Sequence, residues 1–169
     1  MVRPPHVRRF LQGRRAMVES YQACWHGRGF PQERFCVRVD RYRHRCEITT
    51  QVLEQDERGD WQPARTRVRP LTSPEWEQVS AWVEVGFWRQ PSRDAAAAVM
   101  DGDCWRIEGY RDGNYHEVYR HTGSMIEGSG AEVYELGTRL SALARTTASS
   151  FSPCAFFRSS STIAGRRNG

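Results

Sequence analysis

The chain has 169 residues, with 25 basic and 20 acidic side chains and a formal net charge of +5 at pH 7. This length suits one domain, and seven phenylalanines, six tryptophans and six tyrosines can bury enough area to form a core, which excludes a disordered chain. No apolar run is long enough for a transmembrane helix, and no apolar segment of a signal peptide follows the first arginines. We therefore expect a cytoplasmic protein.

The positive charge is concentrated at the two ends of the chain. Residues 1–30 hold six arginines and one glutamate, and residues 147–169 hold three arginines and no acid, whereas residues 31–146 hold 16 arginines against 19 acidic residues. Nucleic-acid recognition needs a basic surface on the folded domain itself, so we expect no specific nucleic-acid partner. The charge pattern predicts a basic amphipathic N-terminal arm (1–30), an α+β domain (31–146) and a disordered basic tail (147–169).

The N-terminal arm has apolar residues at helical intervals. They are Val7, Phe10, Leu11, Met17, Val18, Tyr21 and Trp25. A basic amphipathic helix with this stripe can lie on a membrane or dock on a partner. Two alternatives are that the helix packs against its own domain, and that translation begins at Met17.

Alternating apolar and polar residues predict the first strands of the domain. Residues 35–39 alternate in this way, and so do residues 46–53. The polar loop 56–60 contains a glycine and separates the second of these segments from residues 61–69. We therefore predict a long hairpin over residues 45–69.

A helix is predicted directly after this hairpin. Either Thr72 is the N-cap with Glu75 three residues later as a capping box, or Ser73 is the N-cap with Pro74 at the first helical position. Gly86 is placed to end the helix. The apolar face consists of Trp76, Val79 and Val83, and Phe87 and Trp88 follow as buried anchors.

A second hairpin is predicted around Asp112-Gly113, which favours a two-residue turn. The turn sets the register of strands 104–110 and 114–121. On one surface the facing pairs are Tyr110–Tyr115, Glu108–Glu117, Arg106–Tyr119 and Cys104–His121. On the other surface they are Gly109–His116, Ile107–Val118 and Trp105–Arg120. We assign the second surface to the core and place Trp105 against Val118 and the helix that begins near Thr72.

A last helix is predicted from Ser129, with Glu132 three residues later as a capping box. Its apolar face consists of Val133, Leu136, Leu140 and Leu143. Strand runs interrupted by helices indicate an α+β fold. We expect an antiparallel sheet of about five strands, covered on one side and packed with two to three helices.

Four short motifs connect this chain with other bacterial proteins. They are Leu71-Thr72-x-x-Glu75-Trp76, Gly86-Phe87-Trp88, Asp101-Gly102-x-x-Trp105-x-x-Glu108-Gly109 and Gly113-x-Tyr115-His116-x-Val118-x-Arg120. With these motifs, residues 34–145 resemble a widespread family of small uncharacterised bacterial proteins. The resemblance implies one fold unit and a bacterial origin, and it carries no activity. After Arg120 this chain departs from the family pattern. It has His121-Thr122-Gly123 where the family pattern predicts an aromatic residue followed by Ser-Pro.

Glu108, His116 and Arg120 are the candidates for acid–base catalysis. In the predicted register His116 lies on the opposite surface from Glu108 and Glu117, so a direct dyad would need a different register. Two glutamates facing each other cost stability unless something relieves the repulsion. A raised pKa of one carboxyl would do so, and so would a nearby arginine such as Arg106.

The five cysteines are Cys24, Cys36, Cys46, Cys104 and Cys154. They are widely spaced, odd in number and without a CxxC motif, so we predict free thiols in a reducing compartment. Cys104 facing His121 has the composition of a nucleophile with its base, although a cysteine is more often a small buried apolar residue. Cys36, His44 and Cys46 would not share a face of the sheet, so we expect no metal site, and no cofactor.

The predicted binding residues are Arg106, Tyr110, Tyr115 and Tyr119, which share one surface of the second hairpin. These residue types are enriched at binding hot spots. The alternative is that the last helix covers this surface and buries them. Our leading hypothesis is a non-enzymatic bacterial protein-binding module, such as an inhibitor or immunity-type partner of another protein. The alternatives are a small enzyme that uses the three catalytic candidates on a polar substrate, and nucleic-acid or membrane association through the arginine-rich arms.

Overall fold

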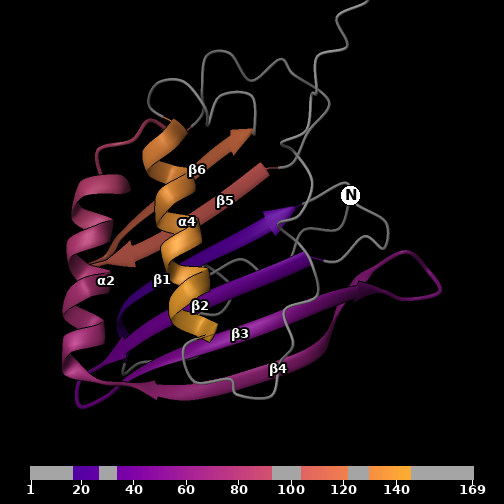
Figure 1. Cartoon of the computed structure of the whole chain (residues 1–169), viewed down its shortest axis with the longest axis horizontal. Coiled ribbons are helices and arrows are strands. Elements are labelled where there is room, and N and C mark those ends of the chain that lie inside the picture. The colour runs from indigo at the N-terminus through magenta and orange to yellow at the C-terminus, as the bar shows by residue number, and fades with distance from the viewer. Residues whose placement is uncertain (1–16, 27–33, 93–103, 122–129, 146–169) are drawn as a thin grey trace, which may run out of the picture.

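The computed structural model describes residues 17–26, 34–92, 104–121 and 130–145. The elements in chain order are β1 (Met17–His26), β2 (Arg34–Tyr42), β3 (Cys46–Gln55), β4 (Trp61–Leu71), α2 (Ser73–Gly86), β5 (Cys104–Arg111), β6 (Asn114–His121) and α4 (Gly130–Arg145). The strands form one antiparallel sheet in the order β4-β3-β2-β1-β5-β6 (Figure 1). The α+β fold is thus confirmed, with six strands and, in the described residues, two helices.

Residues Met17–His26 form the strand β1, so the predicted N-terminal helix is wrong for this segment. The strand lies inside the sheet between β2 and β5. Tyr21 and Ala23 are buried on one face, and Ser20 and Cys24 are buried on the other. A strand buried on both faces shows no alternation of polarity, which is why its apolar residues could fit a helical period. The domain therefore includes residues that we had assigned to the arm, while residues 1–16 and the tail after 145 lie outside the described residues.

The sheet has one covered edge and one open edge. At the β6 edge, the Tyr119 amide donates a hydrogen bond to the Ser92 carbonyl at 3.0 Å. At the other edge, the predicted hairpin of β3 and β4 is confirmed, and residues 62–68 of β4 are exposed. Pro63 and Pro70 lie in this outer strand, where a missing amide hydrogen is tolerated.

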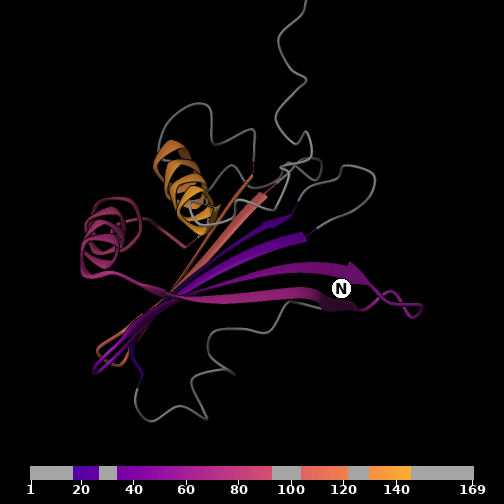
Figure 2. The ribbon, with the colours of Figure 1, turned by 60° about the horizontal axis from the view of Figure 1, so that its bottom comes forward.

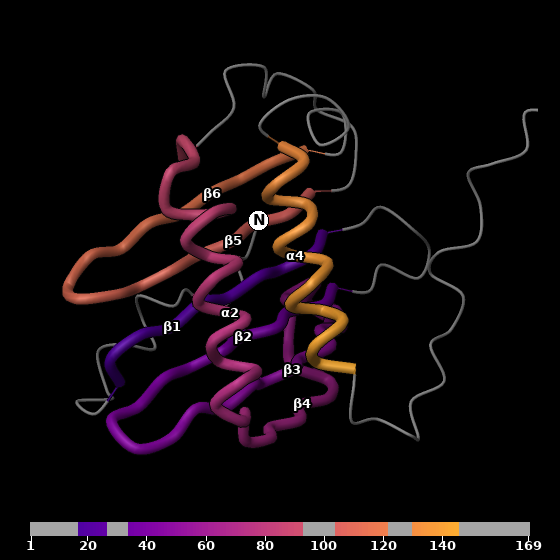
Figure 3. The backbone as a smooth tube through the Cα atoms, turned by 60° about the vertical axis from the view of Figure 1, so that its left-hand side comes forward, coloured from indigo at the N-terminus to yellow at the C-terminus, as the bar shows by residue number. Residues whose placement is uncertain are grey.

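The two helices lie side by side across one face of the sheet (Figure 3). The predicted capping box of α2 is confirmed, because the Thr72 amide donates to the Glu75 carboxylate at 2.8 Å and the Thr72 hydroxyl accepts from the Glu75 amide at 3.4 Å. Arg69 of β4 donates to Glu75 at 2.9 Å and to the Leu143 carbonyl at 2.8 Å. The hydrogen bonds from Arg69 lower the pKa of Glu75. One arginine thus joins the start of α2 to the end of α4.

The core fills the space between the helices and the sheet. Its fully buried residues include Tyr21, Ala23, Val37, Val39, Val79, Val83, Phe87, Ile107, Val118, Val133 and Leu140. Trp105 is only 5% exposed, as predicted. Its ring lies against Gly137, however, where a Cβ would come within 2.6 Å of the indole. The helix that packs on Trp105 is therefore α4 and not the helix that begins near Thr72.

The register of the β5–β6 hairpin is confirmed at every predicted pair. Asp112 and Gly113 have φ angles of 51° and 83°, and positive values at both positions are what the predicted two-residue turn requires. Gly109 faces His116, and a Cβ on it would lie 2.4 Å from the Phe87 ring. The glycine is therefore needed for the close contact between β5 and the segment after α2.

Candidate functional site

The face of the sheet opposite α2 and α4 carries most of the candidate residues. Both helices of the described residues lie on the same side of the sheet (Figure 2). We call the other side, which carries neither of them, the helix-free face. The register places its side chains from β2, β1, β5 and β6 in four rows that cross the strands. The rows are Arg34, His26, Cys104, His121; then Cys36, Cys24, Arg106, Tyr119; then Arg38, Gln22, Glu108, Glu117; and last Asp40, Ser20, Tyr110, Tyr115.

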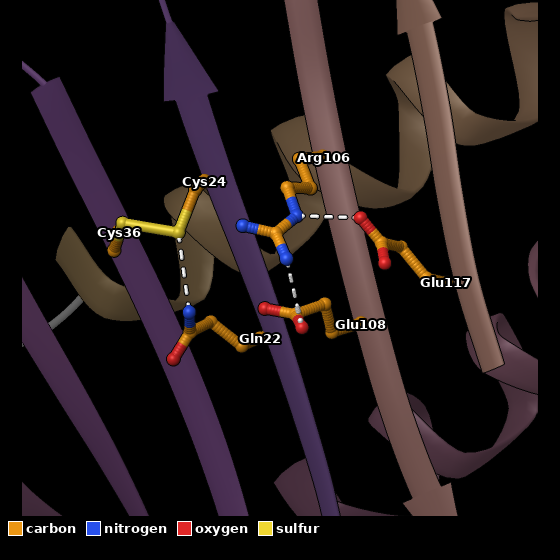
Figure 4. Close-up of a disulfide and its surroundings, with 6 residues drawn as sticks. All are labelled: Gln22, Cys24, Cys36, Arg106, Glu108 and Glu117. Atoms are coloured by element: carbon orange, nitrogen blue, oxygen red, sulfur yellow. Dashed lines mark hydrogen bonds and ion pairs between the residues drawn. A yellow bond between two sulfur atoms is a disulfide. The ribbon is translucent and has the colours of Figure 1, made fainter. Parts of the chain in front are cut away.

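Arg106 is the centre of a charged cluster on this face (Figure 4). Its Nε donates to the Glu117 carboxylate at 2.7 Å, and a terminal nitrogen donates to Glu108 at 3.1 Å. The Tyr115 hydroxyl also donates to Glu108, at 2.5 Å. Arg106 and Glu108 are 6% and 2% exposed. The two glutamates do face each other, and Arg106 between them relieves the repulsion, which was one of the two predicted remedies.

Three tyrosines surround this cluster in the predicted arrangement. Tyr110, Tyr115 and Tyr119 share the helix-free face with Arg106, and all three rings are partly exposed. Burial is the main reason that the pKa of Tyr115 is raised, and its hydrogen bond to Glu108 adds to the effect. The ring of Tyr119 meets the His121 ring edge-on at 5.0 Å. Helix α4 lies on the opposite face, so the alternative that it covers these residues is wrong.

The three catalytic candidates are divided between the two faces. Glu108 lies on the helix-free face, whereas His116 and Arg120 point toward the helices. His116 Nε2 lies 2.8 Å from the Gln90 carbonyl, which can only accept, so this nitrogen carries the hydrogen. Arg120 donates to the Pro91 carbonyl at 2.8 Å. His116 and Arg120 thus hold the segment after α2 against β6.

Cys24 and Cys36 form a disulfide, so the prediction of free thiols is wrong for this pair. They are direct partners on β1 and β2, with their Cα atoms 4.1 Å apart, which suits a closely spaced antiparallel pair. The Gln22 amide nitrogen donates to Cys24 Sγ at 3.4 Å (Figure 4). Cys46 and Cys104 are not part of a disulfide, and Cys154 lies outside the described residues.

Cys104 lies between two histidines in the first row. Its register partners are His121, as predicted, and His26, which the wrong helix assignment had hidden. Burial lowers the pKa of His26 to about 4, and the positive charges of Arg34 and Arg106 add to this effect. Burial also lowers the pKa of Arg34, while its interactions with Cys104 and Tyr119 act in the opposite direction.

The metal-ligand set considered from sequence does not come together. Cys36 is bound to Cys24 on the helix-free face, and Cys46 packs against the helix-side core. In the disulfide-bonded form, the described residues contain no group of three or more His, Cys, Asp or Glu that could hold a metal ion.

A buried carboxylate that the sequence pattern did not single out lies in the fourth row. Asp40 is fully buried and accepts hydrogen bonds from Ser20 at 2.6 Å and from Arg38 Nε at 2.9 Å. Burial raises its pKa, and the two donors oppose this shift. Its buried partner Ser20 belongs to β1. The pairing of Ser20 with Asp40 can therefore be inferred only when residues 17–26 are assigned to a strand.

No protein-family model matches the chain, and no curated protein matches it either. Among the described residues, no helix has the length and apolar character needed to cross a membrane.

Proposed function

We propose that the protein is a non-enzymatic protein-binding module and that its contact surface consists of Arg106, Tyr110, Tyr115 and Tyr119. The observation that carries the proposal is the fixed geometry of Arg106 and Tyr115 at the centre of this surface. Arg106 is held by two carboxylates and Tyr115 by one of them. Because the side chains are already ordered, little rotamer entropy is lost when a partner binds.

The exposed parts of the surface indicate the chemistry of the partner. The tyrosine rings offer apolar area with a polar tip, and they are partly exposed. The side chain of Glu117 is 36% exposed, whereas Glu108 is buried, so Glu117 is the carboxylate of the cluster that a partner can reach. A partner that presents an arginine, lysine or amide donor beside an apolar side chain would complement this surface.

The enzyme hypothesis has less support from the geometry. Glu108 is separated from His116 and Arg120 by the sheet, and the latter two bind backbone carbonyls after α2. A general acid or base has to reach a proton of the substrate, and these three side chains cannot reach one substrate together.

We also propose that the protein acts in the cytoplasm. In that compartment thiols are kept reduced, so Cys24 and Cys36 would be a dithiol there except under oxidation. Alkylation of unpaired thiols during cell lysis, followed by mass spectrometry of the two cysteine peptides, measures the reduced fraction. A pair that is fully oxidised in growing cells would contradict the cytoplasmic location.

The binding proposal is tested by affinity capture from the native host. Full-length wild type, Tyr110→Ala/Tyr119→Ala and a control variant would be used as baits, and bound proteins would be compared by mass spectrometry. Val85→Ala is the control because this residue is exposed on α2, away from the helix-free face. We expect a partner to be captured by wild type and control and lost with the tyrosine variant, since such anchors contribute about 2 kcal/mol or more each.

Purified partner and bait then give the affinities by calorimetry. A partner that binds the tyrosine variant as tightly as wild type would place the contact surface elsewhere. A bait without residues 1–16 and 146–169 shows whether the arms contribute. If only the bait without the arms lost every partner, association through the arginine-rich arms would be favoured instead.

A further inference from the structure

A row of arginines follows β4, the strand at the open edge of the sheet (Figure 1). Arg69 is the register partner of the core residue Ile48, so its side chain lies on the helix side. Side chains alternate along a strand, so Arg65 and Arg67 lie on the same side. Both are exposed, whereas Arg69 is paired with Glu75 of α2. We call these three arginines the edge stripe.

The two prolines of β4 indicate which backbone groups face the open edge. A proline has no amide hydrogen, so in an edge strand its nitrogen faces away from the neighbouring strand. The Pro70 carbonyl accepts from Arg69 at 3.0 Å, which agrees with this direction. Because backbone directions alternate along a strand, the amides and carbonyls of Thr66 and Val68 face the open edge too. One extra residue at the register irregularity gives Pro63 the same direction.

We propose that an extended acidic segment of a partner protein binds along β4 as a seventh strand of the sheet. The backbone of this segment pairs with Thr66 and Val68, and its acidic side chains lie beside Arg65 and Arg67. Strand addition takes its affinity from backbone hydrogen bonds and its specificity from alternate side chains. The site is separate from the tyrosine surface of the helix-free face, so the proposal goes beyond the protein-binding function and does not rest on it.

The side chains of β4 define the sequence pattern of the added segment. Acidic residues complement the edge stripe on the helix side. On the other side Val68 is 55% exposed, next to the exposed Thr66. β-Branched residues pack well at such positions on a pleated surface. The segment therefore alternates acidic and β-branched residues, over about five positions between the two prolines.

A second copy of this chain does not complement the edge. Pairing of two β4 strands would bring two edge stripes side by side, and like charges that face each other across strands are destabilising. Charged residues and prolines on edge strands commonly prevent self-association. Here they exclude another basic strand, while the backbone groups between the prolines can still pair with an acidic one.

The first experiment measures the binding of a synthetic peptide to the full chain. The labelled peptide contains Glu-Val-Glu-Val-Glu between short Gly-Ser ends, and a second peptide has Gln in place of each Glu. We expect saturable binding of the acidic peptide by fluorescence anisotropy, and at least about fivefold weaker binding of the Gln peptide. Affinity should fall as salt is added. Equal affinities, or no saturable binding of the acidic peptide at about 1 mM protein, would overturn the proposal.

The second experiment separates the side chains from the backbone. Arg65→Gln/Arg67→Gln should weaken binding about fivefold or more. Arg58→Gln/Arg89→Gln removes the same charge at exposed positions outside β4 and should bind as wild type does. Val68→Pro removes one outward amide without removing a bond to β3, and should weaken binding about threefold or more. Unchanged affinity in Val68→Pro or in the β4 arginine variant, or a loss in the control, would contradict the site.

Two other occupants are tested with the same proteins. A short single-stranded DNA may be attracted by the edge stripe, but its backbone cannot continue the ladder of the sheet. Tighter binding of DNA than of peptide, lost in the β4 arginine variant and kept in Val68→Pro, would overturn the proposal in favour of nucleic acid. A wild-type dimer in light scattering that Val68→Pro dissociates would assign the edge to a second copy instead.

A measurement on wild type keeps the test decisive if a variant fails to fold. Amide hydrogen exchange is followed by NMR with and without saturating acidic peptide. The amides of Thr66 and Val68 should exchange at least about tenfold more slowly when the peptide is bound, and those of the loop 56–60 should be unaffected. Equal exchange rates of Thr66 and Val68 in the two samples would refute strand addition at this edge.

Discussion

The two faces of the sheet bury their side chains in different ways. On the helix side, apolar residues and two glycines bring α4 and the segment after α2 into close contact with the strands, and Arg120 is the fully buried charge there, bound to the Pro91 carbonyl. On the helix-free face, Arg106, Glu108 and Asp40 are almost completely buried and each is paired with groups of complementary charge or polarity. The first face therefore depends on shape and volume, and the second on the satisfaction of charges.

The largest effect is expected on the helix side. Trp105→Ala removes a ring that fills the space between β5 and Gly137 of α4, and it should lower the free energy of unfolding by about 3–5 kcal/mol. Chemical denaturation followed by circular dichroism measures the change. If the free energy of unfolding fell by no more than the experimental error, the helix side would depend on packing no more than the helix-free face does.

Reduction of the disulfide should have the next largest effect, on the helix-free face. The Cys24–Cys36 bond closes a loop with a sequence separation of 12, so its loss should cost about 3 kcal/mol of stability. The double variant Cys24→Ala/Cys36→Ala serves as the control and should not respond to the reductant. An equal response of that variant would show that the reductant acts elsewhere.

The pH dependence of stability should reveal His26. Its folded pKa of about 4 lies below the ordinary value of 6.5, so the unfolded chain takes up a proton first as the pH falls. Stability is complete above the unfolded pKa and is lost as the pH falls through the window between these values. Arg34, Arg106 and Cys104 surround the ring.

Between about pH 7.5 and about pH 5, wild type should therefore lose about 2 kcal/mol more stability than His26→Gln. The comparison of the two proteins cancels the titration of all other groups that they share. Parallel pH profiles would mean that His26 is solvated, and that the helix-free face is less closed than the helix side.

The smallest predicted effect concerns His116, which lies on the helix side but acts through a hydrogen bond. His116→Gln should lower stability by about 1–2 kcal/mol, since the bond to the Gln90 carbonyl would be imperfectly replaced. Melting temperatures of wild type and His116→Gln, measured at about pH 8, give the difference. An unchanged or higher value would favour a catalytic role, because active-site residues tend to be retained at a cost in stability.

The parts of the fold that could be predicted are those with local signals. The Asp112-Gly113 turn determined the whole β5–β6 register, and Thr72 with Glu75 determined the start of α2. From that register alone, Glu108 was predicted to lie on the opposite face from His116. These signals are local because a turn or a cap needs only a few neighbouring residues.

The parts that were missed depend on β1. Its apolar residues at positions 18, 21 and 25 match a helical period, and its polar residues Ser20 and Gln22 are buried by long-range pairing that the sequence does not display. Once β1 is a strand, its hairpin with β2 brings Cys24 opposite Cys36 and places His26 beside Cys104. The helical period assigned to these residues therefore concealed both the disulfide and the sixth strand.

The position of β1 also has a consequence for synthesis on the ribosome. Its two neighbours are β2, which follows it directly, and β5, which begins only at Cys104. One side of β1 therefore stays without its partner until most of the domain has been translated. At roughly 5–20 residues per second, this interval lasts for several seconds. During that time the nascent chain exposes an incomplete sheet, and chaperone binding would be expected at this stage.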